Sequence, residues 1–251
     1  MTDGKREATL TTSWDDGHPL DLRLAERLAR HGVAATFYLP IRNREGRPVL
    51  NTAEVRELAA AGFAIGSHTH DHVRLESLDE GAIIRQMVWG REVLEDRLGR
   101  AVTGFCPPGG RAVARVRRVA PGLGFTHVRT VEMFRLDPGT DPFACPTTLH
   151  FHPHGPLPLL RNWGRQGLGR ERLRLCLGCL GRSSLEARLE WLLEEAIGRG
   201  GVLHVWGHSW EIEETGSWPL LDRFLARATE RIPAARRLDN ATAFEAAACV
   251  S

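Results

Sequence analysis

The chain has 251 residues, 42% of them hydrophobic and 25% charged, which is the composition of an ordinary globular protein and excludes a disordered or fibrous one. Its formal net charge of +2 is too small to indicate a nucleic acid or an anionic membrane as the partner. The length suits one large α/β domain or two small ones, and we expect a single domain over residues 1–251.

The N-terminal sequence and the cysteines bear on the compartment. The first residues are polar and precede a strand-like segment directly, without the apolar stretch and cleavage site of a secretory signal. No apolar stretch approaches the ~20 residues of a membrane-spanning helix. The five cysteines are odd in number and scattered, which fits reduced thiols better than a disulfide framework. We therefore expect a cytoplasmic protein with no membrane anchor.

Strand-like and helix-like segments alternate along most of the chain. Runs of apolar, β-branched and aromatic residues predict strands, and apolar residues repeating every three to four positions predict helices. In chain order, we predict a strand at 8–14, a helix at 20–31, a strand at 33–39, a helix at 52–61 with Thr52 as candidate N-cap, a strand at 63–66, a helix at 78–98, a strand at 102–105, a helix at 112–119 and a strand at 125–130.

The second half of the chain is less regular. Residues 132–181 are rich in Pro, Gly, His and Arg, and we expect a loop-rich insertion there with one short strand near 147–151. A helix capped by Ser183 or Ser184 then runs to Ile197, a strand covers 202–206, and two further helices end the chain.

Repeated strand–helix units predict a parallel sheet covered by helices, either closed as a barrel or open and doubly wound. Polar clusters follow the strands that end near Trp14, Gly66, Phe105, Arg129 and Trp206. The C-terminal ends of strands are where α/β barrels build active sites, so we predict a distorted, TIM-like (β/α) barrel of about seven parallel strands.

Two adjacent carboxylates, Asp15 and Asp16, follow the first predicted strand. Carboxylates this close repel each other unless a cation or a proton compensates one of them, and a metal ion is the natural compensation. The alternative is a solvated Asp-Gly turn in which Asp16 caps the following helix.

Three histidines and an aspartate crowd into residues 68–72. His68 and His72 are spaced so that both can bind one ion. Imidazole and carboxylate together suit Zn²⁺, Co²⁺, Ni²⁺, Mn²⁺ or Fe²⁺ better than Ca²⁺ or Mg²⁺, and zinc is the expected ion. The alternative is a polar loop whose histidines form local hydrogen bonds.

Taken together, these residues resemble the polysaccharide deacetylase family, whose sequences carry Asp-Asp-Gly after the first strand and His-Ser/Thr-x-x-His further on. Residues 14–17 and 68–72 match these two motifs. Residues 104–110 look like the third motif of the family and residues 206–210 like the last. The resemblance extends from the first strand to at least Trp210, and the motifs come in the order of the family.

The resemblance implies a role for each matched residue within a distorted (β/α) barrel. It implies one metal ion held by Asp16, His68 and His72, with Asp15 as the catalytic base and His208 as the catalytic acid. Three protein ligands leave an open metal position for water and the substrate carbonyl, which fits hydrolysis of an acyl group.

Residues around the implied metal are candidates for binding the substrate. The metal and a backbone N–H near Pro107-Pro108-Gly109 are expected to stabilise the oxyanion, while His208 protonates the leaving amine. Trp210, like Trp14 and Trp206, flanks a motif and can stack on a sugar ring or simply belong to the core.

One residue departs from the pattern of the family. Members often have arginine where Cys106 stands, and that arginine is thought to pair with the catalytic aspartate. Arg111 or Arg129 can supply the missing cation from another direction, and we favour Arg129 because it ends a predicted strand. The alternative for both is a surface salt bridge.

Other clusters carry weaker signals. The histidine-rich segment His150–His154 is a candidate second metal site, although in an irregular loop it fits the wall of the substrate cleft or a solvent contact better. Cys176 and Cys179 have the spacing of a metal or redox pair, but a single pair fits two ordinary thiols better. His204 precedes His208 along the same strand, so either histidine could face the site. We choose His208 as the histidine of the site because it stands at the end of that strand.

The sequence therefore predicts a metal-dependent hydrolase that removes an acyl group from an amino sugar. N-acetyl is the expected acyl group, and the sugar is expected to be nucleotide-linked, lipid-linked or part of an antibiotic. Other amide C–N hydrolases on the same scaffold, such as a deformylase or an allantoinase-like enzyme, stay open as alternatives. So do a sugar O-acetyl esterase and a carbohydrate-binding protein without turnover. The partner in each case is a small molecule and not a nucleic acid.

Overall fold

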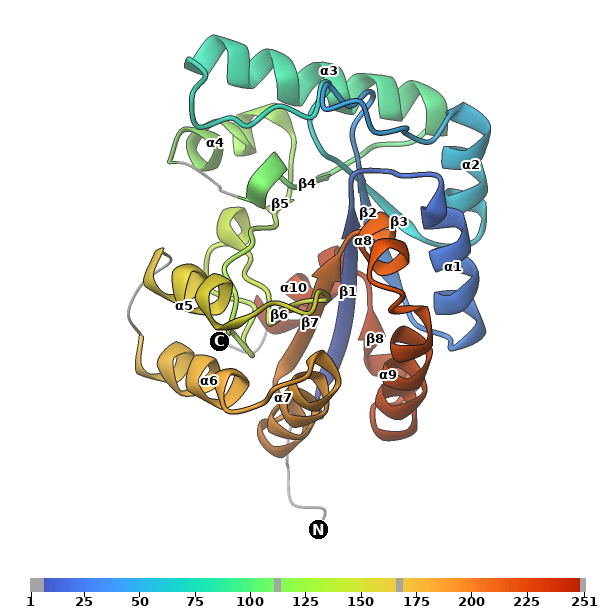
Figure 1. Cartoon of the computed structure of the whole chain (residues 1–251). Coiled ribbons are helices and arrows are strands. Elements are labelled where there is room, and N and C mark those ends of the chain that lie inside the picture. The colour runs from blue at the N-terminus through green and yellow to red at the C-terminus, as the bar shows by residue number, and fades with distance from the viewer. Residues whose placement is uncertain (1–6, 111–113, 166–168, 249–251) are drawn as a thin grey trace.

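The computed structural model describes residues 7–110, 114–165 and 169–248. Its centre is a sheet of parallel strands, with helices around the outside (Figure 1). The strands are β1 (Thr9–Asp15), β2 (Ala35–Leu39), β3 (Ala64–Ser67), β4 (Gly104–Phe105), β5 (His127–Val128), β6 (Leu149–His150), β7 (Val202–Gly207) and β8 (Arg237–Leu238).

Helices follow most strands, as the alternating sequence pattern predicts. They are α1 (Leu20–Arg30), α2 (Thr52–Ala60), α3 (Glu80–Leu98), α4 (Ala114–Val119), α5 (Pro156–Arg165), α6 (Arg170–Leu180), α7 (Leu185–Arg199), α8 (Ser209–Glu214), α9 (Trp218–Arg231) and α10 (Asn240–Ala248). No helix within the described ranges is long and apolar enough to cross a membrane.

The strands run in the order β5-β4-β3-β2-β1-β7-β6, and β8 pairs with the first half of β1. Residues 145–148 link the two edges of this sheet. Cys145 exchanges backbone hydrogen bonds with the end of β5, from its N–H to Val128 O at 2.9 Å and from the Thr130 N–H to its own carbonyl at 2.8 Å. Thr148 N–H donates to His204 O on β7 at 2.8 Å. The sheet thus curls into a distorted barrel of parallel strands, which confirms the predicted fold class.

The inside of the barrel is polar around β1. Ser13 Oγ lies 2.8 Å from His204 Nε2, and Asn240, the first residue of α10, donates to Thr11 Oγ1 at 2.9 Å. Tyr38 donates to Asn240 Oδ1 at 3.0 Å. These groups are buried and bonded to one another, so His204 belongs to the interior of the barrel and does not reach the cavity that His208 lines.

The expectation of a loop-rich insertion over 132–181 is wrong for much of that segment, because α5 and α6 occupy 156–165 and 170–180. Pro156 and Pro158 stand in the first turn of α5, where a missing N–H breaks no helical bond. The proline and arginine content therefore led to a loop prediction where two helices form. The inner face of this helix pair is buried and includes Leu159 and Leu175.

Two smaller expectations also need correction. The N-cap of α2 is Asn51 and not Thr52, because Asn51 Oδ1 accepts from the Ala53 and Glu54 N–H groups and Glu54 accepts in return from the Asn51 N–H. Three helices and β8 follow β7, where we expected two helices, because α8 and α10 are too short to give a clear periodic signal.

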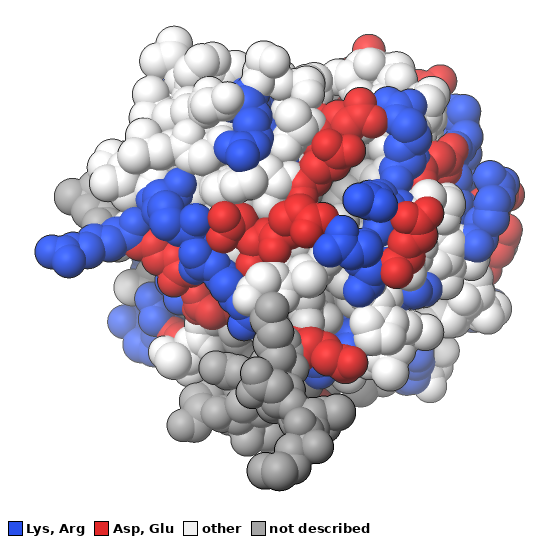
Figure 2. Space-filling model, turned by 90° about the horizontal axis from the view of Figure 1, so that it is seen from below, with Lys and Arg blue, Asp and Glu red and all other residues white. Residues whose placement is uncertain are grey.

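The face seen from below carries acidic and basic side chains interspersed (Figure 2). Ion pairs join neighbouring helices on the outside of the barrel: Arg223 on α9 bonds Glu186 on α7 at 2.7 Å, and Arg174 on α6 bonds Glu195 on α7 at 2.7 Å. Exposed pairs of this kind each contribute only ~0.2–1 kcal/mol, so the buried core carries most of the stability.

Candidate active site

A cavity of about 220 Å³ opens at the C-terminal ends of β1, β3 and β7. This is the edge at which parallel barrels place their reactive groups. Its wall consists of Asp15, Asp16, Glu45, His68, His72, Arg74, Pro108, Gly109, Gly110, Val131, Trp206, His208 and Trp210. Residues far apart in the sequence therefore share one small space because their strands run parallel.

Asp16 and two histidines form the first cluster in the cavity. Asp16 Oδ1 lies 2.9 Å from His72 Nε2 and 3.5 Å from His68 Nε2, and one ligand atom from each residue lies within 4.8 Å of the others. Trp210 Nε1 donates to the second carboxylate oxygen at 3.0 Å. Burial raises the pKa of Asp16, but the bonds with His68 and His72 and the charge of His208 lower it by more, so the carboxylate is ionised.

The backbone around this cluster is held in an uncommon conformation. Asp16, Thr69 and His72 have φ angles of 78°, 69° and 53°, in the left-handed region that residues other than glycine rarely occupy. Such residues each cost ~1–3 kcal/mol and persist where the surrounding fold enforces a particular side-chain position. Two of the three are members of the cluster.

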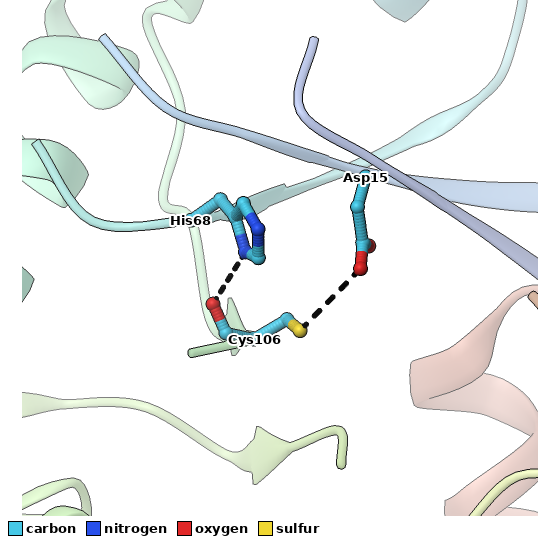
Figure 3. Close-up of side chains that lie close together, drawn as sticks. All are labelled: Asp15, His68 and Cys106. Atoms are coloured by element: carbon cyan, nitrogen blue, oxygen red, sulfur yellow. Dashed lines mark hydrogen bonds between the residues drawn. The ribbon is translucent and has the colours of Figure 1, made fainter. Parts of the chain in front are cut away.

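The ring of His68 is oriented by a neighbouring strand. Its Nδ1 donates to the carbonyl oxygen of Cys106 at 2.6 Å (Figure 3), and its Nε2 lies 3.5 Å from Asp16 Oδ1. A carbonyl in this position fixes the tautomer that a metal-binding histidine needs. One ionised carboxylate and two imidazoles, one of them fixed in this tautomer, fit a divalent ion of the zinc type.

A second group of possible ligands, Asp15, His68 and Cys106, overlaps the first (Figure 3). It is the poorer donor set, because burial raises the pKa of the Cys106 thiol, and the nearby Asp15 and Asp16 charges raise it further against the opposing effect of Arg129. A thiol must lose its proton to bind a metal. Of these two groups, Asp16, His68 and His72 are therefore the better candidate to hold a metal ion.

Asp15 forms a buried ion pair with Arg129, which stands just after β5. Both side chains are almost fully buried, and the guanidinium lies 5.2 Å from the Tyr38 ring and 5.0 Å from the Trp206 ring. Burial lowers the pKa of Arg129, but Asp15, Cys106 and Tyr38 together raise it by more, so the arginine stays charged. Arg129 is therefore the residue that pairs with Asp15, while Arg111 lies outside the described residues.

His208 is held by a carboxylate that the sequence analysis missed. Its Nδ1 donates to Glu211 Oε2 at 2.6 Å, and its Nε2 lies 3.8 Å from Asp16 Oδ2. Burial lowers the pKa of His208, but the bond to Glu211 and the charges of Asp16, Glu211 and Asp15 raise it by more, to about 9. The spacing of three residues at the start of α8 is the signal that could have found Glu211.

The turn after β4 forms one wall of the cavity. Pro108 and Gly109 line it, whereas Pro107 is buried and is not part of the wall. Only Gly109 among these three has a backbone N–H, because the other two are prolines. Gly109 is therefore the one candidate oxyanion donor of that segment.

The family model of polysaccharide deacetylases matches residues 2–128, which is half of the chain. The chain belongs to the polysaccharide deacetylase family. The matched stretch holds Asp15, Asp16, His68 and His72, whereas Arg129, His208 and Trp210 follow it. Their place in the site rests on the geometry described above.

Individual members of the family show how far the likeness extends. A peptidoglycan-N-acetylglucosamine deacetylase from Bacillus cereus is 33% identical over 127 residues, which cover 50% of this chain and 44% of that protein. The chain thus aligns with less than half the length of this relative.

Two solved structures share the fold. The chitin deacetylase from Colletotrichum lindemuthianum aligns over 95% of this chain and 88% of its own, with a TM-score of 0.60 and 18% identity. A pseudoenzyme from Bacillus anthracis aligns over 89% of this chain and 61% of its own, with a TM-score of 0.54 and 16% identity. At these identities the likeness shows the fold alone, so the activity must be argued from the residues of this chain.

Proposed function

We propose that this polysaccharide deacetylase family member is a metal-dependent hydrolase that removes an acyl group, first of all acetyl, from the nitrogen of an amino sugar. One observation carries the proposal. A set of possible metal ligands, a carboxylate paired with a buried arginine, and a histidine paired with a glutamate all surround a single cavity of about 220 Å³. Asp16, His68 and His72 would hold the ion, with zinc as the expected metal.

We assign each residue a step of the reaction from the contacts that it makes. The ion, when bound, would supply the Lewis acid that polarises the acyl carbonyl and lowers the pKa of water. Asp15 accepts the proton of the attacking water, and Arg129 holds its carboxylate in place. His208 keeps Nδ1 bonded to Glu211, so Nε2 on the cavity side is the atom that gives a proton to the leaving amine.

An N-acetylated amino sugar is the preferred substrate because the B. cereus relative is named for that chemistry. The same groups could cleave a formyl amide, a cyclic amide or a sugar ester, since the acyl portion contributes little to this chemistry. A binding protein without turnover remains a distinct outcome, which the pseudoenzyme with the same fold makes worth testing.

The decisive measurement combines metal content with product release. We expect the purified chain to hold about one equivalent of metal by elemental analysis and to release acetate from a panel of N-acetylated amino sugars. The Asp16→Asn/His68→Ala variant should lose both. Asparagine tolerates the positive φ of position 16, so the fold should survive the change.

The matched control is His70→Asn, in the same segment but outside the cavity wall, which should keep metal and activity. A wild-type chain that binds no metal would refute the mechanism. Bound metal without release from N-acetyl, N-formyl, cyclic-amide or O-acetyl substrates would favour a binding role.

A further inference from the structure

The histidine-rich segment 150–154 has no role in the reaction proposed above. His150, the last residue of β6, lies opposite Trp206 in the pairing of β6 with β7. Its ring stacks on the Trp206 ring, with a centroid distance of 4.0 Å and an angle of 9° between the ring planes. His208 follows Trp206 by two residues. The strand pairing therefore brings His150 next to the candidate acid, although the two histidines lie far apart in the sequence.

Glu211 links the two histidines. Its Oε2 lies 2.8 Å from His150 Nε2 and 2.6 Å from His208 Nδ1, so one carboxylate oxygen bonds both rings. Burial raises the pKa of Glu211, but the bonds with the two histidines lower it by more, so the carboxylate is ionised. An ionised carboxylate only accepts hydrogen bonds. Both of these ring nitrogens therefore carry a proton that points to Glu211.

His154 completes the bonding of the His150 ring. Burial, the largest cause, and nearby charges lower the pKa of His154 to about 3, so this ring is neutral. Burial also lowers the pKa of His150 against the opposing effect of Glu211. His150 is thus a neutral ring with its proton on Nε2, and its Nδ1 accepts from His154 Nε2 at 2.8 Å. Both ring nitrogens of His150 are engaged, which fixes the orientation of the ring.

The far end of this series of bonds is anchored in the fold. Arg188 on α7 is buried, and its guanidinium donates to the carbonyl of His154 at 2.6 Å and to two further backbone carbonyls. His150 and His154 line a second cavity of about 560 Å³, which shares the Trp206 wall with the first, and neither is among the residues that line the first. His150 can therefore affect a reaction in the first cavity only through the residues that it bonds.

We propose that His150 is a positioning residue for the catalytic acid: its Nε2–H holds Glu211 in the orientation that keeps His208 bonded through Nδ1, with Nε2 directed at the leaving amine. The inference rests on the proposed function, because it adds a residue to the same site. A carboxylate held by one bond fewer is free to rotate. A shift of ~1 Å in the position of a reacting group can cost ~10²-fold in rate.

Two substitutions separate the N–H donor of His150 from its ring. His150→Phe keeps a ring against Trp206 but has no N–H, whereas His150→Gln loses the ring but can place an amide N–H near the position of Nε2. We expect His150→Phe to lower kcat for amide deacetylation ~10- to 100-fold with little change in KM. His150→Gln should recover most of that rate. His152→Phe, in the same segment but lining neither cavity, is the matched control and should keep the wild-type rate.

A double variant tests whether His150 acts through His208. In a chain that carries His208→Ala, His150→Phe should slow deacetylation no further, because the residue that it positions is gone. As a single variant, His150→Phe should slow an amide substrate more than an ester. Three results would each overturn the proposal: equal losses on amide and ester, no recovery by His150→Gln, or a full loss that persists in the His208→Ala chain.

A readout without turnover keeps this test separate from the proposed function. Proton NMR of the wild-type chain should show a downfield ring N–H signal that disappears in His208→Ala and therefore belongs to His208. His150→Phe should speed the exchange of this proton with water, and His150→Gln should not. If the signal behaves in this way but no substrate loses its acyl group, the positioning by His150 holds and the hydrolase does not. If acetate is released but the signal is unchanged in His150→Phe, the reverse holds.

His150, His208 and Glu211 are also close enough to one another to bind a metal ion. Elemental analysis distinguishes this role from positioning, which needs only the one equivalent expected in the first cavity. His150→Phe should leave that equivalent in place. Two equivalents in the wild-type chain and one in His150→Phe would make the cluster a metal site and overturn the proposal.

Discussion

The pairing of Asp15 with Arg129 joins the candidate base to a cation from a different strand. Arg129→Met should lower the free energy of unfolding by ~3–5 kcal/mol, because removing one partner leaves a buried charge uncompensated. Urea unfolding measures this change. The Asp15→Asn/Arg129→Met double variant should recover most of the stability, since both charges are then gone. A double variant as unstable as the single one would contradict this account of the pair.

The role proposed for His208 predicts different losses of rate on amide and ester substrates. We expect His208→Ala to slow amide deacetylation by ~10²–10⁴-fold, because a poor amine leaving group needs the proton. An ester substrate should be slowed less, since an alkoxide leaves more easily. Parallel rates on an N-acetyl and an O-acetyl sugar measure the difference, and His152→Ala, outside the wall of the first cavity, serves as the control. Equal losses on both substrates would argue against His208 as the acid.

The contiguous motifs made half of the site predictable. Asp15 and Asp16 are neighbours in sequence and His68 and His72 share one segment, so local spacing sufficed. Arg129 was favoured only because it ends a strand, and Glu211 was missed. The partner of Arg129 lies on a different strand, a contact that sequence periodicity does not encode, whereas Glu211 stands three residues after His208 and that spacing was overlooked.

At the scale of elements, the turn after β4 shapes the wall of the first cavity. Gly110 has a φ of 66°, and a Cβ added there would overlap the side chain of Val131, which lines the cavity of the candidate active site. Gly110→Ala should therefore cost more stability than Gly109→Ala, although both positions carry the ~1–3 kcal/mol penalty for positive φ. A Cβ on Gly109 would approach only Arg74 Nε, at 3.8 Å.

Thermal or urea unfolding of the two alanine variants gives the comparison. The same variants should also differ in acetate release, because only Gly110→Ala forces Val131 to move. Equal stability and equal activity of the two variants would show that the turn tolerates displacement.

The elements themselves were predictable wherever burial imposed a regular period. β1 and β7 each fall within about one residue of their predicted bounds, as expected of strands buried between helices. The α5–α6 pair was missed, because proline at a helix start and proline in a loop look the same in sequence. Their packing against the barrel, rather than their composition, makes them helical.

The molecule as a whole should lose stability in mild acid. Burial lowers the pKa of His204 to about 3 and that of His127 to about 4, so the unfolded chain binds protons below pH ~6.5 that the folded chain does not. The contribution of these two histidines to stability is therefore full above that pH and falls as the pH drops toward the folded values. For His204 alone the loss between pH 7.5 and pH 5 is ~2 kcal/mol.

Urea unfolding at about pH 7.5 and about pH 5 measures the drop. His204→Gln removes the titrating ring and should reduce the difference between the two pH values by ~2 kcal/mol, whatever its effect at neutral pH. An unchanged difference would assign the acid lability to other groups.

Arg129 also matters when related sequences are classified as active or inactive from their motifs. Curators who look for an arginine at position 106 would score this chain as defective, because Cys106 stands there. Yet the charge reaches the aspartate from the end of β5. Related chains that lack the motif arginine should be inspected at the end of the following strand before they are classified as inactive.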